Sequence, residues 1–443
     1  MLQENVYQKP VTLRNVLKFA VPTIVMTMFM SFYTMVDGLF VSNLIGTDAL
    51  SAVNLTAPVI SLVTAISTML ATGGSAVIMR KVGEEKIQEA NQDFTFLILA
   101  NVLVGLVMTF LGYLAMDLIF QSMNLSPSVS GYCRAYLSRY LWFTVPILLM
   151  NNFALYMIAA GKSAVSMVCT VAGGILNIVL DYVFIEIFHM GISGAAMATG
   201  LGYSVTAAVG LFLFSKKTSL IHFVKPVCRR KTLIQAAVNG SSEMATALVT
   251  GIVTMMFNWT MLKYVGEDGV AAITIIMYVL MFVTSLYTGY TYGVAPMISY
   301  YYGEQNQEKL RRLIRLSLKV VGVIGVLSLV GSLAVTRPLV GVFARPDNPV
   351  YDLAVTGNRI CSLALVFIGF NVFASGMFTA LSNGFISAVL AFSRSFLFMV
   401  IAMVALPLLL GVNGVWLATP AAELAAICQA VFFFVKYRKK YSY

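Results

Sequence analysis

Apolar residues run along this chain in long stretches, separated by short polar or glycine-containing breaks. Stretches of roughly 20 apolar residues recur from end to end, the length that an α-helix needs to cross a hydrocarbon core of about 30 Å. The pattern predicts twelve transmembrane helices, at residues 16–43, 52–78, 94–114, 136–159, 165–187, 192–214, 236–262, 271–299, 316–335, 353–380, 386–410 and 415–435. The predicted fold class is therefore all-α integral membrane.

The composition supports lipid as the solvent of this chain. Of its 443 residues 59% are hydrophobic and only 11% are charged, whereas about 25% are charged in a typical soluble domain. The five cysteines have no C-x-x-C spacing and there are only two histidines. Neither a disulfide framework nor a zinc site is expected.

Basic residues predict the orientation of the chain in the membrane. The net charge is +11, and with both termini placed in the cytoplasm most of the Lys and Arg side chains outside the spans fall on the cytoplasmic side, as the positive-inside rule predicts. We therefore expect a multi-pass protein of the plasma (bacterial inner) membrane. Membrane lipids, and not nucleic acid, are the expected partners of the basic loops.

The second half of the chain repeats the first at an offset of 220 residues, as Gly46 against Gly266 illustrates. The same offset holds without a gap across six spans, through Asp48/Asp268, Gly83/Gly303, Asn151/Asn371, Phe153/Phe373, Gly191/Gly411 and Thr199/Thr419. The predicted organisation is a first lobe at 1–215, a cytoplasmic linker at 216–235 and a second lobe at 236–443. Two parallel six-helix repeats are typical of secondary transporters, whose substrate route lies between the lobes.

Four acidic residues lie well inside the predicted spans: Asp37, Asp181, Glu243 and Glu423. An intramembrane carboxylate costs several kcal/mol unless it is neutralised or paired, so each is a functional candidate. Glu423 and Arg394, which is also inside a span, are expected to pair with each other.

In the first lobe, Asn177 and Asp181 share a helix face at a spacing of i, i+4, and Asp37 and Thr199 fall at a similar depth. Two carboxylates, an amide oxygen and a hydroxyl suit a hard monovalent cation, and two neighbouring carboxylates can bind a proton instead. At the 220 offset Asp37, Asn177 and Asp181 correspond to Phe257, Leu397 and Ile401, respectively. An ion site is therefore expected in the first lobe only.

Three segments resemble signatures of the multidrug and toxic compound extrusion (MATE) transporters, and the resemblance covers the whole chain. They are YTMVDGLFVSNLIGTDALSAVNL, LNIVLDYVFIEIFHMGISGAAMAT and, in the manner of the DinF-like and MepA-like branch, LPLLLGVNGVWLATPAAELAA. The resemblance implies two six-helix lobes in a V, alternating access, and efflux of organic, often cationic and lipophilic compounds in exchange for Na⁺ or H⁺. It also assigns the coupling ion, as Na⁺ ligands if Na⁺ is used, to Asp37, Asn177, Asp181 and Thr199.

Contacts with the substrate are expected in the second lobe, from Glu243, Asn258, Tyr287 and Tyr290. A monomer with a small-molecule organic substrate and no cofactor besides the coupling ion is expected. The alternative is a flippase for a lipid-linked substrate, which would need several cationic side chains in its cavity. A membrane enzyme is not expected, because no H-E-x-x-H, G-x-S-x-G or nucleotide-binding glycine loop is present.

Overall fold

The computed structural model describes residues 6–45, 47–122 and 126–443, and the regular structure in these residues is helical throughout. The α-helices are α1 (Leu13–Leu44), α2 (Thr47–Gly83), α3 (Ile87–Ser122), α4 (Pro127–Trp142), α5 (Thr144–Ala159), α6 (Ser163–Tyr182), α7 (Ile192–Ser215), α8 (Arg230–Tyr264), α9 (Glu267–Gly303), α10 (Gln307–Gly341), α11 (Pro349–Cys361), α12 (Leu365–Ala380), α13 (Gly384–Phe392), α14 (Phe398–Leu410) and α15 (Val412–Tyr441). Short 3-10 or π-helical turns are η1 (Val6–Gln8), η2 (Val183–Ile187), η3 (Ser362–Ala364) and η4 (Ser393–Leu397).

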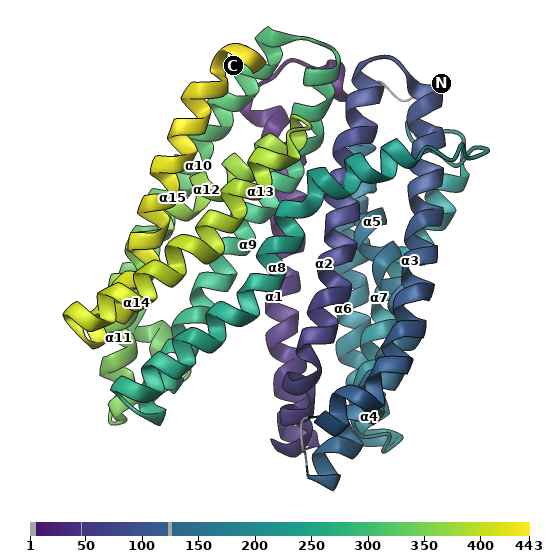
Figure 1. The fold of residues 1–443 in the computed structure, drawn as a ribbon. Helices are drawn as coiled ribbons and strands as arrows, with labels where there is room; N and C mark the ends of the chain where they lie inside the picture. The colour runs from purple at the N-terminus through teal and green to yellow at the C-terminus, as the bar shows by residue number, and fades with distance from the viewer. Residues whose placement is uncertain (1–5, 46, 123–125) are drawn as a thin grey trace.

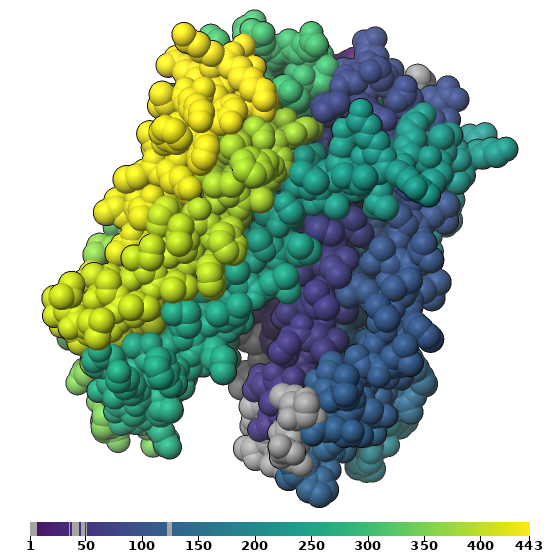
Figure 2. Space-filling model, in the orientation of Figure 1, coloured from purple at the N-terminus to yellow at the C-terminus, as the bar shows by residue number. Residues whose placement is uncertain are grey.

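Within the described residues, 11 segments are long and apolar enough to span a membrane, and the bent pair α4–α5 makes 12 if it counts as one span. The predicted all-helical membrane fold is confirmed. Helices α1–α7 form an N-lobe and α8–α15 a C-lobe, arranged as a V (Figure 1). Both chain ends lie at one face, called here the terminal face. Figure 2 shows the lobes separated at the opposite, open face.

The backbone repeats the symmetry that the sequence predicts. Gly191 and Gly411, equivalent at the 220 offset, precede α7 and α15 with φ values of 56° and 58°. Glu85 and Gln305 form a second equivalent pair, at φ 60° and 56°. A positive φ is favourable for glycine and uncommon for other residues, so the same two tight turns were kept in both halves.

The predicted span 136–159 is broken in the structure, which corrects the sequence reading. Helix α4 ends at Trp142 and α5 begins at Thr144, with a bend of 54° between them. Pro146 explains the position of the break, because its ring removes the N–H that would bond to the carbonyl of Trp142 four residues earlier.

Several helices extend beyond the apolar stretches at the terminal face. Helices α3, α8 and α10 begin at Ile87, Arg230 and Gln307, where the predicted spans began at 94, 236 and 316. Charged first turns end an apolar stretch without ending backbone hydrogen bonding, so hydropathy underestimates helix length. The linker is correspondingly shorter than predicted, at 216–229.

The linker is fixed to the N-lobe along much of its length. The His222 backbone N–H donates to Asn91 Oδ1 at 3.0 Å, and that of Val224 to Thr95 Oγ1 at 3.1 Å. The Phe223 ring packs 5.1 Å from that of Phe94. If the lobes move relative to each other, the linker therefore has to bend between Val224 and the start of α8 at Arg230.

A buried carboxylate anchors the end of the linker. Asp93 on α3 has no exposed surface, and it pairs with Lys81 Nζ on α2 at 2.5 Å and with Arg229 Nη1 at 3.0 Å. We expect Asp93→Ala to lower the free energy of unfolding by about 3 kcal/mol, because two partly buried cations lose their buried partner and keep only the half-exposed carboxylate of Glu89. Unfolding in mixed detergent–SDS micelles would measure this.

The control is Asp117→Ala, whose carboxylate is 58% exposed and pairs with the exposed Arg134. A pair of that kind contributes about 0–1 kcal/mol. Equal losses in the two variants would contradict an anchoring role for Asp93.

The lobes meet near the terminal face through glycine contacts, and we call this contact the seam. A Cβ atom at Gly83 on α2 would lie 2.1 Å from the Tyr300 backbone oxygen on α9, and a Cβ at Gly303 would lie 2.0 Å from that of Arg80. The contact is reciprocal, since Arg80 and Tyr300 are equivalent at the 220 offset.

The seam continues where α2 packs on α8 and α1 packs on α9. A Cβ at Gly73 would lie 1.9 Å from the backbone oxygen of Ala236, and one at Gly240 would lie 1.9 Å from that of Met69. At the equivalent place, a Cβ at Gly293 would lie 2.7 Å from Ala20 Cα. Backbone therefore touches backbone across the seam, which closes the route between the lobes on this side.

The amino-terminal segment covers the seam. Tyr7 is 1% exposed; its hydroxyl donates to the Ala159 backbone oxygen at 2.6 Å, and its own backbone oxygen accepts from the Tyr301 hydroxyl at 3.1 Å. Its ring stacks on that of Tyr300 at 4.9 Å. Burial raises the pKa of the Tyr7 phenol, so the hydroxyl remains a donor at physiological pH. One side chain thus binds both lobes.

Candidate functional site

Helix packing brings the four predicted ion-site residues into one part of the N-lobe. Helix α6 packs against both α1 and α7. It carries Asn177 and Asp181, which are 2% and 0% exposed, while α7 contributes Thr199, which is 7% exposed. Asp37 enters from α1 and is half-buried. The i, i+4 spacing on α6 directs its two side chains to the same side of the helix.

The polar contacts of this cluster leave several acceptor oxygens without a donor. Asn177 Nδ2 donates to Thr199 Oγ1 at 3.3 Å, and that hydroxyl donates to the Ala195 backbone oxygen at 3.0 Å. The carboxyl groups of Asp37 and Asp181 lie close enough to influence each other electrostatically. Asp37 Oδ1, both carboxylate oxygens of Asp181 and Asn177 Oδ1 are buried and accept no hydrogen bond.

Such an arrangement is unfavourable for two bare carboxylates in a low-dielectric interior. A proton shared between the carboxyl groups, or a monovalent cation bound by these oxygens, would remove the repulsion. The described residues contain no group of three or more His, Cys, Asp and Glu side chains that could hold a metal ion. Carboxylate, amide and hydroxyl oxygens are hard donors, a kind that alkali and alkaline-earth cations prefer to the softer nitrogen and sulfur ligands of most transition-metal sites.

Tyrosines surround the acidic pair, a feature that the sequence reading did not identify. The hydroxyls of Tyr33 and Tyr203 form a hydrogen bond to each other, and Tyr33 is 3% exposed. Tyr136 and Tyr140 stack nearby, with ring centroids 6.3 Å apart. The spacing was available in the sequence, because Tyr33 precedes Asp37 by four residues and so lies on the same helix face.

A small cavity adjoins the cluster within the N-lobe. It has a volume of about 10 Å³, enough for about one water molecule. Gly173, Gly174 and Gly202 line it together with Met30, Tyr33, Met150, Thr170, Asn177, Tyr203 and Thr206. The Thr170 hydroxyl is buried without a partner, so the cavity has polar atoms free to bind.

Glu243, predicted to contact substrate, lies at the seam on α8. Its Oε2 accepts a hydrogen bond from the Tyr292 hydroxyl on α9 at 3.2 Å. Both residues line a cavity of about 30 Å³ that also has residues of α2, α5 and α12 in its wall. Glu243 is thus placed between the lobes, near their closed contact.

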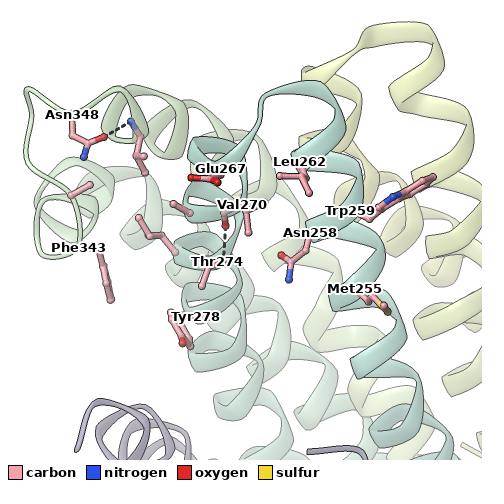
Figure 3. Close-up of a pocket in the computed structure, with 14 residues that line it drawn as sticks. Met255, Asn258, Trp259, Leu262, Glu267, Val270, Thr274, Tyr278, Phe343 and Asn348 are labelled. Atoms are coloured by element: carbon pink, nitrogen blue, oxygen red, sulfur yellow. Dashed lines mark hydrogen bonds between the residues drawn. The ribbon is translucent and has the colours of Figure 1, made fainter. Parts of the chain in front are cut away.

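Asn258 lies about four turns further along α8, in a groove toward the open face (Figure 3). The groove has a volume of about 810 Å³ and is lined by residues of α8, α9, the segment after α10 and the first turn of α11. Its wall includes the exposed rings of Trp259, Tyr278 and Phe343 and the carboxylate of Glu267. Asn258 Oδ1 is buried and accepts no hydrogen bond.

The other two predicted substrate residues take part in packing in this conformation. Tyr287 and Tyr290 on α9 are fully buried inside the C-lobe. Their hydroxyls donate to the Leu365 backbone oxygen at 2.8 Å and to Ser317 Oγ at 3.0 Å. The structure therefore does not bring them together with Asn258 or Glu243.

The predicted ion pair between Arg394 and Glu423 is confirmed. Arg394 Nε donates to Glu423 Oε1 at 2.8 Å, and the two side chains are 17% and 6% exposed. The pair joins η4 to α15 in the interior of the C-lobe.

Comparison with known proteins gives a consistent result over nearly the whole length. The family described as MatE matches residues 22–183 and 244–404. The multidrug export protein MepA of Staphylococcus saprophyticus is 21% identical over 415 residues, which cover 93% of this chain and 89% of that protein.

Two solved structures share the fold. A crystal structure of MATE in the straight conformation matches with a TM-score of 0.92 and 24% identity, covering 100% of this chain and 99% of the other. An outward-facing multidrug resistance MATE family transporter of the MOP superfamily matches with a TM-score of 0.90 and 22% identity, covering 100% and 97%.

Proposed function

This chain belongs to the MatE family, and on that premise we propose that it exports lipophilic organic cations in exchange for Na⁺ or H⁺ bound in the N-lobe. The observation that carries the proposal is the set of unpaired oxygens on Asp37, Asn177 and Asp181. Two interacting carboxylates without a donor have an affinity for one positive charge, and binding or release of that charge changes the electrostatics of the N-lobe interior.

The shape of the molecule supports alternating access as the means of coupling. The lobes are closed at the seam and separated at the open face. The basic residues of the termini and linker support a cytoplasmic location for the terminal face under the positive-inside rule, and with that orientation the open face would be directed outward across the plasma membrane. A substrate would leave the protein from this conformation.

The groove around Asn258 supports a cationic substrate. Aromatic faces and the Glu267 carboxylate favour flat lipophilic cations, with cation–π contacts of about 0.5–2 kcal/mol each. None of the residues that line the groove is Lys or Arg. That lining favours export of cations over flipping of an anionic lipid-linked substrate.

Ethidium uptake into inverted membrane vesicles tests the proposal. We expect an imposed gradient of either Na⁺ or H⁺, applied separately, to drive ethidium into vesicles that contain the protein and not into vesicles without it. The gradient that works identifies the ion. Uptake that is equal with and without either gradient would contradict antiport and favour a channel.

A further inference from the structure

The C-lobe holds a second polar centre around Glu423, built from three elements. Arg394 Nε on η4 donates to Glu423 Oε1 at 2.8 Å, and Asn371 Nδ2 on α12 donates to Oε2 at 2.7 Å. The Asn371 amide also donates to the Glu423 backbone oxygen at 3.0 Å. Both carboxylate oxygens therefore have a donor, in contrast to those of Asp181 in the N-lobe.

The internal repeat relates this centre to the N-lobe cavity. At the 220 offset Arg394 corresponds to Gly174 and Glu423 to Tyr203, and both N-lobe residues line the cavity of about 10 Å³ beside Asn177. Where the C-lobe places a guanidinium group, the N-lobe has a glycine packed against an aromatic ring, since a Cβ atom at Gly174 would lie 2.5 Å from Phe29 Cε1. Thr419 precedes Glu423 by one turn and is 7% exposed, as is its equivalent Thr199.

The donor set around Glu423 is that of a cation site. Besides the carboxylate, Asn371 Oδ1 is buried without a hydrogen-bond partner, and Asn371 is 4% exposed. A carboxylate and an amide oxygen suit a hard cation. Arg394 sits on a π-helical turn, an irregularity that is frequent at functional sites and that redirects a side chain.

We propose that Arg394 is a tethered cation that occupies a cation site in the C-lobe and so prevents a second exchangeable ion from binding there. Removing the guanidinium while keeping Glu423 opens the site to a monovalent cation from solution, either Na⁺ or H⁺. The inference rests on the proposed function in one respect: it takes the N-lobe as the site of the first exchangeable ion.

One other ionisable group near Arg394 belongs to a neighbouring helix. Glu243 on α8 interacts electrostatically with the guanidinium and is hydrogen-bonded to Tyr292 of α9. An effect of Arg394 removal could therefore arise at Glu243 instead of Glu423. The test has to separate these two carboxylates.

The experiment measures binding of ²²Na⁺ to the purified full-length protein in a background of Asp37→Asn and Asp181→Asn, which removes the N-lobe carboxylates. Three proteins are compared: the background alone, the background with Arg394→Met, and the background with Arg394→Met and Glu423→Gln. Methionine keeps an unbranched stem without the charge. We expect saturable Na⁺ binding only in the second protein, at about one ion per chain.

The pH dependence of the melting temperature distinguishes H⁺ from Na⁺ as the ion that takes the site. If H⁺ takes the site, the second protein binds no ²²Na⁺, but its melting temperature falls as pH rises and the third protein shows no such fall, because an unpaired Glu423 must bind a proton to remain neutral. The inference is overturned if the second protein, folded by size-exclusion chromatography, shows neither behaviour. It is also overturned if either behaviour persists in the third protein, which would assign it to Glu243.

The background protein tests the proposed N-lobe ion site independently of Arg394. Residual Na⁺ binding by the background protein would contradict the proposed coupling residues, while the increment between the second and third proteins would still report on Arg394.

Discussion

Asp181→Asn and Asp37→Asn are each expected to abolish gradient-driven export, with a loss of about 100-fold in the initial rate, equivalent to about 2.7 kcal/mol. Asn has nearly the shape of Asp but no charge to hold Na⁺ and no proton to exchange. Because neither carboxylate oxygen of Asp181 accepts a hydrogen bond in the structure, Asp181→Asn breaks no hydrogen bond to those oxygens, and a folding defect is not the expected cause of its loss.

Ethidium uptake into inverted vesicles under the effective gradient measures this. Asp117→Asn is the matched control, since that aspartate is 58% exposed and should export at the rate of the unmodified protein. The double variant should lose no more than either single variant, because the two carboxyl groups act as one unit. Normal export by both single variants would show that the acidic pair is structural and would make Glu243 the next candidate.

Gly240→Val is expected to shift the protein away from the closed seam and to lower export at least about tenfold, a change of about 1.4 kcal/mol in the balance of the two states. A Cβ at this position would lie 1.9 Å from the Met69 backbone oxygen. A backbone atom is unable to move aside as a side chain would, so α8 has to separate from α2. The strain exists only while the seam is closed.

Distances between spin labels at Lys86 and Glu308, which are exposed at the terminal face on different lobes, would report the opening. The exposed Cys228 and Cys428 are first replaced by Ser. We expect a longer-distance population to grow in Gly240→Val. Gly251→Val, on the same helix, is the control, because a Cβ atom at Gly251 would meet no neighbouring atom within 4 Å. An unchanged distance distribution in Gly240→Val would contradict the role of the seam glycines.

Most of the architecture could be predicted because lipid imposes a simple rule on sequence. Each span has to be apolar and helical, so apolar stretches locate helices, and the repeat assigns them to two lobes. The rule fails where helices are irregular. It did not find the break at Phe143, which depends on one proline, nor the charged first turns that extend α3 and α10 beyond the membrane.

That Asp37, Asn177, Asp181 and Thr199 lie in one part of the N-lobe could be predicted for a similar reason. Carboxylates are rare in spans, and the spacing of Asn177 and Asp181 fixes their shared face, so few arrangements were available. The seam could not be predicted in this way. Gly83 and Gly303 were recognised as equivalent, but their contact depends on how the two lobes dock. The covering position of Tyr7 likewise depends on Ala159 and Tyr301, which are distant in sequence.

The reciprocal contact of Gly83 and Gly303 has a consequence for the origin of the chain. In an interface between two identical copies related by a two-fold axis, residue i of one copy meets residue j of the other, and j meets i. The seam still obeys that condition after the halves have diverged inside their lobes. It has the form of a homodimer interface, so a single six-helix ancestor could already have paired with itself before duplication and fusion joined both copies in one polypeptide.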